Sequence, residues 1–206
     1  MKDYISIGGQ HVAQDEEKLS KVMDLLGIQI QRKALAEYET GEIVKLGKFE
    51  MVVLEQFGQE TALILKDLFV EESEFAAENN RYDGSIADSH CELFAQALSE
   101  VIGWDNIVLH EVDLTSNDGL KDYGTVERRA SLITADMYRK YVDILDAVNL
   151  KKYWWLATPY STKRQANDIW VKCVAPSGYI RIDGYNGGVC GVRPFCILKS
   201  SIFVSC

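Results

Sequence analysis

The chain of 206 residues has little proline, with three, and little cysteine, with five. The cysteines are scattered and form no Cys-x-x-Cys pair, which argues against a disulfide framework and a structural zinc site. No apolar run reaches the ~18 residues that a membrane-spanning helix needs, and no basic segment followed by an apolar stretch opens the chain as in a secretion signal. We therefore expect reduced thiols, no membrane insertion and a cytoplasmic setting.

Catalytic motifs are also missing. The sequence has no His-Glu-x-x-His, no Gly-x-Ser-x-Gly, no glycine-rich phosphate loop and no Gly-x-Gly-x-x-Gly. Its three histidines, His11, His90 and His110, stand far apart. His110 could join Glu111 and Asp113 as a ligand set on a strand, but a solvated strand edge is the simpler interpretation. The sequence therefore predicts a protein that is not an enzyme and that uses no cofactor or metal.

Charge is distributed unevenly along the chain. Residues 1–150 carry 14 lysines and arginines against 29 acids, whereas residues 151–206 carry 8 against 2. A basic segment rich in Tyr and Trp suits an anionic ligand, although it could equally dock on the acidic part of its own chain. Sequence-specific nucleic-acid binding is disfavoured, because the whole chain is acidic, with a pI of about 4.9.

The first 40 residues are expected to form a helical extension. Residues 15–26, "DEEKLSKVMDLL", place apolar residues at helical spacing after acids in the first turn. Gly27 stops or kinks this helix, and a second helix is expected through "QRKALAEYE" to about Glu39. Such an extension could make homo-oligomers, although packing on its own domain is the commoner outcome.

The pattern after Gly41 predicts an α+β domain. "EIVKLGKFEMVVLEQF" and "TALILKDLF" read as a β-hairpin over about residues 42–69. "IADSHCELFAQALSEVIG" has one apolar helical stripe that ends at Gly103, and Thr134 is a helix N-cap with Asp136 in the first turn. Beyond Lys151, strand-like pieces alternate with turns. This order is typical of an α+β fold and not of a doubly wound sheet.

An oxygen-rich loop lies in the middle of the chain, at "DLTSNDGLKDYG". Asp113, Thr115, Asn117, Asp118 and Asp122 offer hard oxygen ligands. However, Asp118 stands where a calcium-binding EF-hand loop needs glycine, and no glutamate sits at the twelfth position. A network of Asx turns is the preferred interpretation of this loop, and calcium binding stays open.

Two neighbouring tryptophans, Trp154 and Trp155, lie in one expected strand. Successive side chains of a strand point to opposite faces, so the pair predicts a central strand that is covered on both sides. The polar, basic loop "PYSTKRQAND" leaves this strand. A variable loop on a rigid strand is a common basis for a binding surface.

Several segments in this order resemble a bacterial and phage family of domains of unknown function. They are "GEIVKLGKFEMVVLE", "VDLTSNDGLKDYG", "SLITADMYRKY", "WWLATP", "GYIRIDGY" and "GVRPFCIL". The resemblance covers about residues 41–206 and implies a C-type-lectin-like fold, with residues 1–40 as an N-terminal extension. That fold is related to formylglycine-generating enzymes and to the variable proteins of diversity-generating retroelements, which include phage receptor-binding proteins. The resemblance thus adds a phage particle to the expected settings.

The same relatives share a Gly-Val-Arg-like signature, which Gly191, Val192 and Arg193 match. Arg193 presents a five-donor fork that can tie backbone carbonyls together, so we expect an architectural role for it. Formylglycine-generating enzymes use a closely spaced cysteine pair upstream of this signature. Here Cys190 and Cys196 straddle it instead, so copper-dependent oxidase chemistry is not implied.

The sequence therefore predicts a ligand-recognition domain for a glycan or a protein, with an anionic ligand favoured by the basic segment. Aromatic faces stack on sugar rings or fill pockets, and Lys and Arg donate to oxygen atoms. Trp170 and Tyr179 could instead be core residues, because they sit at alternating strand positions. The alternative function is a structural or assembly protein that oligomerises through residues 1–40. The expected ligand-binding residues are Tyr160, Lys163, Arg164, Trp170, Tyr179, Arg181, Tyr185 and Asn186.

Overall fold

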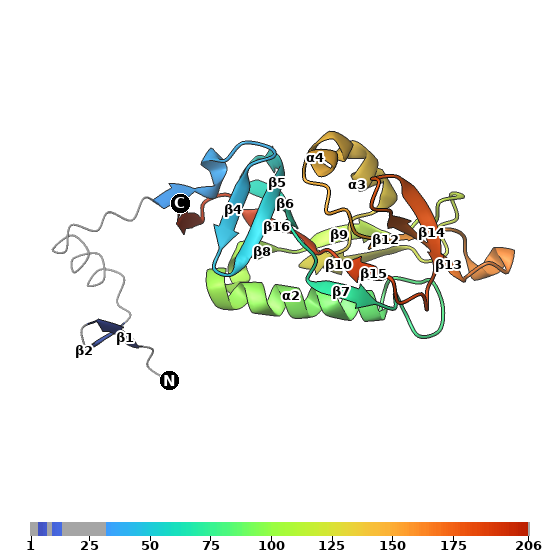
Figure 1. Ribbon diagram of the computed structural model, residues 1–206, viewed down its shortest axis with the longest axis horizontal. Helices are drawn as coiled ribbons and strands as arrows, with labels where there is room; N and C mark the ends of the chain where they lie inside the picture. The colour runs from blue at the N-terminus through green and yellow to red at the C-terminus, as the bar shows by residue number, and fades with distance from the viewer. Residues whose placement is uncertain (1–3, 8–9, 14–31, 206) are drawn as a thin grey trace.

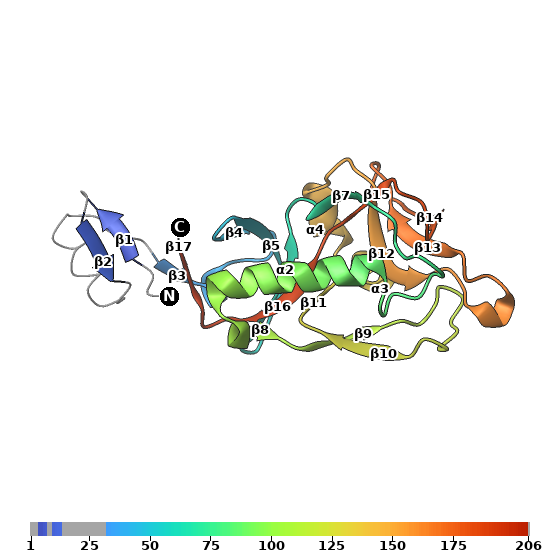
Figure 2. The same ribbon diagram turned by 90° about the horizontal axis from the view of Figure 1, so that it is seen from below.

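The computed structural model describes residues 4–7, 10–13 and 32–205, and these form a mixed α+β fold, as the sequence predicts. The body has three layers (Figures 1 and 2), with the long helix α2 (Ile86–Ile102) along one side of the strands and the short helices α3 (Ala135–Lys140) and α4 (Val142–Ala147) on the other. No helix within the described residues is long and apolar enough to cross a membrane.

A six-stranded sheet forms one end of the body. Its order is β11-β16-β6-β5-β4, and β8 also pairs with β16. The hairpin predicted over residues 42–69 is confirmed for β5 and β6, but the segment expected as its first strand forms two strands, β4 and β5. Gly47, at a φ of 58°, turns the chain between β4 and β5, so a meander of three strands replaces the hairpin. The strands are β4 (Ile43–Leu46), β5 (Phe49–Phe57), β6 (Glu60–Leu65), β8 (Ile107–Val108), β11 (Ala130–Ser131) and β16 (Phe195–Lys199).

A five-stranded sheet forms the other end, in the order β14-β13-β12-β15-β7. Its central strand is buried at every position. Trp155 packs with the residues beneath α2, whereas Trp154 packs with the residues beneath α3 and α4. The prediction of a strand covered on both sides is therefore confirmed. The strands are β7 (Val70–Ser73), β12 (Trp154–Pro159), β13 (Trp170–Val174), β14 (Ile180–Gly184) and β15 (Cys190–Val192).

Helix α2 begins and ends where the sequence indicates. The side chain of Ser85 caps it by accepting a hydrogen bond from the backbone N–H of Asp88, and Gly103 ends it at a φ of 81°. Phe94 and Leu98 from its apolar stripe are fully buried under the six-stranded sheet. The expected cap of Thr134 on α3 is also present, with its hydroxyl accepting from the backbone N–H of Met137.

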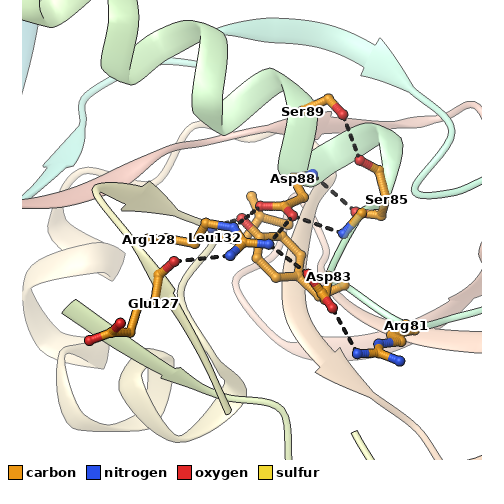
Figure 3. Close-up of polar contacts among 10 residues, drawn as sticks. Arg81, Asp83, Ser85, Asp88, Ser89, Glu127, Arg128 and Leu132 are labelled. Atoms are coloured by element: carbon orange, nitrogen blue, oxygen red, sulfur yellow. Dashed lines mark hydrogen bonds and ion pairs between the residues drawn. The ribbon is translucent and has the colours of Figure 1, made fainter. Parts of the chain in front are cut away.

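A hairpin of β9 (His110–Asp113) and β10 (Thr125–Arg128) is tied to the start of α2 (Figure 3). The guanidinium of Arg128 donates to both carboxylate oxygens of Asp88, at 2.8 and 2.7 Å, and to Asp83 at 2.8 Å. Those carboxylates raise the pKa of Arg128 above its usual range. Because Asp88 also accepts from the N–H of Gly84 at 2.9 Å, one carboxylate joins the hairpin, the helix and the loop before it.

The expected helix through "QRKALAEYE" to about Glu39 is wrong. Residues Arg32–Ala34 form strand β3, which pairs with β17 (Phe203–Ser205), and Leu35–Glu37 form the 3-10 turn η1. Leu35 is fully buried in the core under α2, and its N–H donates to the carbonyl of Ile202 at 2.9 Å. Pairing with the C-terminal strand therefore overrides the local helical pattern.

Residues Tyr4–Ile7 and Gln10–Ala13 form two paired antiparallel strands, β1 and β2, and not part of a helix. The helix expected over residues 15–26 lies outside the described residues. The division of the chain at residue 40, and oligomerisation through what precedes it, stay predictions.

Arg193 lies in the turn between β15 and β16 and is 1% exposed. Its guanidinium donates to the carbonyls of Leu65 at 2.8 Å and of Lys66 at 3.2 Å, and it sits 5.2 Å from the ring centre of Trp154. Burial lowers the pKa of this guanidinium to about 10. Arg193 thus ties together backbone carbonyls, as its five-donor fork suggests.

Candidate functional site

The polar loop after β12 is fastened to the oxygen-rich loop of residues 113–122. Asp118 accepts from the hydroxyl of Ser161 at 2.7 Å, and Asp122 accepts from Thr162 at 2.6 Å and from Arg164. Asp118 also accepts a hydrogen bond from the hydroxyl of Ser116 within its own loop. The acids of the oxygen-rich loop therefore bind hydroxyl and guanidinium groups, and this fixes the position at which Tyr160 leaves the sheet.

Asn80 completes this fastening from a third segment. It is fully buried, and its side-chain amide donates to the carbonyls of Ser161 and Trp170, each at 2.9 Å. Its side-chain oxygen accepts from the hydroxyl of Tyr123 at 2.8 Å. Asn80 therefore holds the loop after β12 beside the start of β13.

Tyr160, Trp170 and Lys172 gather on one face of the five-stranded sheet, where β12 ends and β13 begins, and we call them the aromatic–lysine surface. The N–H of Tyr160 donates to the carbonyl of Trp170 at 2.9 Å, and the ammonium of Lys172 lies 5.2 Å from the ring centre of Tyr160. Trp170 and Lys172 share a face because they are two residues apart on β13. Tyr160 and Trp170 are 37% and 40% exposed, so Trp170 is a surface residue and not a core one.

The charge of this surface is positive. Burial lowers the pKa of Lys172, and the guanidinium of Arg139 on α3 lowers it further. Among the ion pairs within residues 32–205, none involves Lys172. Arg139 itself pairs with Asp136, so Lys172 is the cation of this surface that has no carboxylate partner within residues 32–205. Its half-buried ammonium favours an anionic ligand.

The register of β13 with β14 divides the predicted ligand-binding residues between two faces. Arg181 is the cross-strand partner of Cys173, so it lies on the face opposite Trp170. There its guanidinium sits 5.1 Å from the ring centre of Tyr153 and 3.8 Å from Asp183. Tyr179, 60% exposed, falls on the face of Arg181 by strand alternation. It too is a surface residue.

The other predicted residues lie in loops at the same end of the molecule. Tyr185 is partly buried against the core under α2, and its carbonyl accepts from the N–H groups of Phe75 and Ala76. Asn186 is exposed in the loop between β14 and β15, and Lys163 and Arg164 are exposed in the 3-10 turn η3 (Lys163–Gln165). The structure therefore brings together Tyr160 and Trp170 and places the rest around them or behind them.

Lys172 and Arg139 are the members of this site that the sequence prediction missed. Lys172 could have been found, since alternation along "WVKCV" puts it on the face of Trp170. Arg139 could not, because its approach depends on how α3 packs on the sheet.

The basic C-terminal segment is partly neutralised by the acidic part of the chain. Lys152 pairs with Asp67 at 3.3 Å and with Glu71 at 2.9 Å, and Arg164 pairs with Asp122. For Lys152 and Arg164, the basic segment therefore does dock on the acidic part of its own chain, as the alternative interpretation of the sequence expects. These contacts leave the aromatic–lysine surface uncovered by carboxylates of the described residues.

His110 does not form a ligand set with its neighbours. Its ring packs edge-on against Phe195, its Nε2 lies 3.0 Å from the hydroxyl of Ser131, and burial lowers its pKa to about 4. Glu111 points to the opposite face of β9, since it is the next residue along. The expectation of a solvated strand edge is therefore wrong for His110, which the core holds in its neutral form.

No family model matches this chain, and neither curated proteins nor solved structures include a significant match to it.

Proposed function

We propose that the chain is a non-enzymatic recognition domain of C-type-lectin-like architecture, of phage or bacterial origin, that binds an anionic glycan through the aromatic–lysine surface. The mixed sheets with one long helix are in keeping with that architecture. The observation that carries the proposal is the pair of exposed rings, Tyr160 and Trp170, beside an ammonium without a carboxylate partner in the described residues.

A glycan fits this arrangement for two physical reasons. The flat apolar face of a sugar ring packs on an indole or a phenol ring, which buries apolar area on both sides. A carboxylate or hydroxyl on the same sugar would accept hydrogen bonds from Lys172 and experience the charge of Arg139. The fixed loop supports such binding, because a site that is ordered in advance loses less conformational entropy on association.

The test compares two exposed tryptophans. The purified chain, Trp170→Ala and Trp104→Ala are applied to a glycan array that includes uronic and sialic acids, and hits are measured by calorimetry. Trp104 is the matched control, since it is 42% exposed and lies after α2 in another part of the chain. A central aromatic contact contributes about 2 kcal/mol or more, so Trp170→Ala is expected to weaken binding about 30-fold, with Trp104→Ala unchanged.

Lys172→Ala is the second arm, with Lys199→Ala as its control. Loss of a charge-assisted hydrogen bond costs about 1.5–3 kcal/mol, and added salt is expected to weaken the wild-type complex. Glycan binding that survives both Trp170→Ala and Lys172→Ala would refute the proposed surface. A ligand found only on a parallel protein array, lost in the same two variants, would keep the surface and replace the glycan by a protein.

A further inference from the structure

Three side chains with metal-binding donors converge behind the β13–β14 hairpin. The thiols of Cys173 on β13 and Cys190 on β15 and the carboxylate of Asp183 on β14 have one donor atom each, and all three lie within 4.8 Å of one another. They come from three strands of one sheet and are separated by up to 17 positions along the chain. The fold, and not a local motif, brings them together.

The donor set selects a class of cation. Two thiolates and one carboxylate suit Zn²⁺ and related thiophilic divalent ions, which bind Cys sulfur at about 2.3 Å and carboxylate oxygen at about 2.0–2.2 Å. Tetrahedral geometry at those lengths separates the donors by about 3.5–3.8 Å. The donors therefore have to move together by at most about 1 Å.

Burial gives the cluster an inner and an outer side. Cys173 and Cys190 are fully buried, whereas the side chain of Asp183 is 20% exposed. An ion therefore reaches the thiols past Asp183, and the exposed side leaves a fourth position for a water molecule.

The charges of the cluster balance when a divalent cation is present. Two thiolates and a carboxylate carry three negative charges, and the cation with the guanidinium of Arg181, 3.8 Å from Asp183, carries three positive ones. A neutral, fully paired set is the form of charge that a protein interior tolerates. Cysteine binds a metal ion as the thiolate, so metal binding at this cluster would release protons.

We propose that Cys173, Asp183 and Cys190 form a binding site for one Zn²⁺-class cation that joins strands β13, β14 and β15. This site is independent of the proposed glycan surface, since Cys173 and Trp170 lie on opposite faces of β13. Its role is to stabilise the hairpin that carries that surface.

The experiment uses the full chain, kept reduced with a phosphine, and titrates it with Co²⁺. One equivalent is expected to produce a thiolate-to-cobalt charge-transfer band in the near ultraviolet, and Zn²⁺ is expected to displace it. Cys173→Ala with Cys190→Ala abolishes the band, while Cys196→Ala retains it, because Cys196 is equally buried in another core cluster. Asp183→Asn, which keeps both thiols and the size of the side chain, weakens Co²⁺ affinity at least 10-fold.

A thermal-shift measurement covers the variants that fold poorly. Zn²⁺ is expected to raise the melting temperature of the wild type and of Cys196→Ala, and to raise that of Asp183→Asn clearly less. The proposal is overturned if the reduced wild type shows no charge-transfer band. It is equally overturned if Cys196→Ala removes the band or if Asp183→Asn leaves affinity and thermal shift unchanged.

Discussion

Replacing Arg128 by Met is expected to lower the free energy of unfolding by more than the loss of an exposed ion pair would. The substitution keeps most of the side-chain length but leaves Asp88, whose side chain is 7% exposed, without its cation at the start of α2 (Figure 3). Removing one partner of a buried ion pair costs about 3–5 kcal/mol. Arg128 is itself 23% exposed, and Asp88 keeps the N–H of Gly84, so we expect a loss of about 2–3 kcal/mol.

Urea denaturation followed by tryptophan fluorescence measures this loss. At a slope of about 2 kcal/mol per molar urea, the midpoint of Arg128→Met is expected to fall by about 1–1.5 M. Arg81→Met is the matched control, because Arg81 pairs with Asp83 at 2.7 Å but is 46% exposed. An exposed pair contributes about 0–1 kcal/mol, so its midpoint should move little.

A double-mutant cycle identifies the cause. Asp88→Asn alone and Arg128→Met alone should each destabilise, and the double variant should lose at least about 1 kcal/mol less than their sum. Equal midpoints for Arg128→Met and Arg81→Met, or strict additivity in the cycle, would refute the assignment of this network as a buried connection between β10 and α2.

Two further predictions concern other buried groups. Arg193→Ala removes donors to two carbonyls and leaves a cavity beside Trp154, so a loss of about 2–4 kcal/mol in the same urea assay is expected; an unchanged midpoint would contradict its architectural role. His110 has a pKa lowered by burial to about 4, below the ordinary 6.5. The unfolded chain therefore takes up a proton that the folded chain does not, and the stability that neutral His110 contributes above pH 6.5 declines as pH falls toward 4. The free energy of unfolding of the wild type relative to that of His110→Gln should therefore fall by about 2 kcal/mol from pH 7 to pH 5. A difference that does not change with pH would contradict the burial of a neutral His110.

Features that depend on local periodicity were accessible from the sequence. The apolar stripe and the terminal glycine define α2, and alternation alone places Trp154 and Trp155 in separate core clusters. The turn at Gly47 was missed because the strand pattern continues on both sides of it. A glycine with positive φ closes a tight turn without any change in hydrophobicity.

Features that depend on register and topology were not accessible. The pairing of Cys173 with Arg181 decides which face Arg181 occupies, and that register is set by the turn between β13 and β14. The approach of Cys190 to Cys173 requires strands β12 and β15 to lie parallel in one sheet. The sequence predicted the residue types of a binding surface, and the strand pairing decided which of them share it.

The pairing of β3 with β17 brings the two ends of the described body together (Figure 2). The hairpin of β13 and β14 lies at the far end of the long axis (Figure 1). A molecule attached to a sensor chip or a bead next to strand β17 would therefore point strand β13, which carries Trp170, away from the support. Immobilisation by that route keeps the surface open to ligands in solution, whereas random coupling through lysines would consume Lys172 itself.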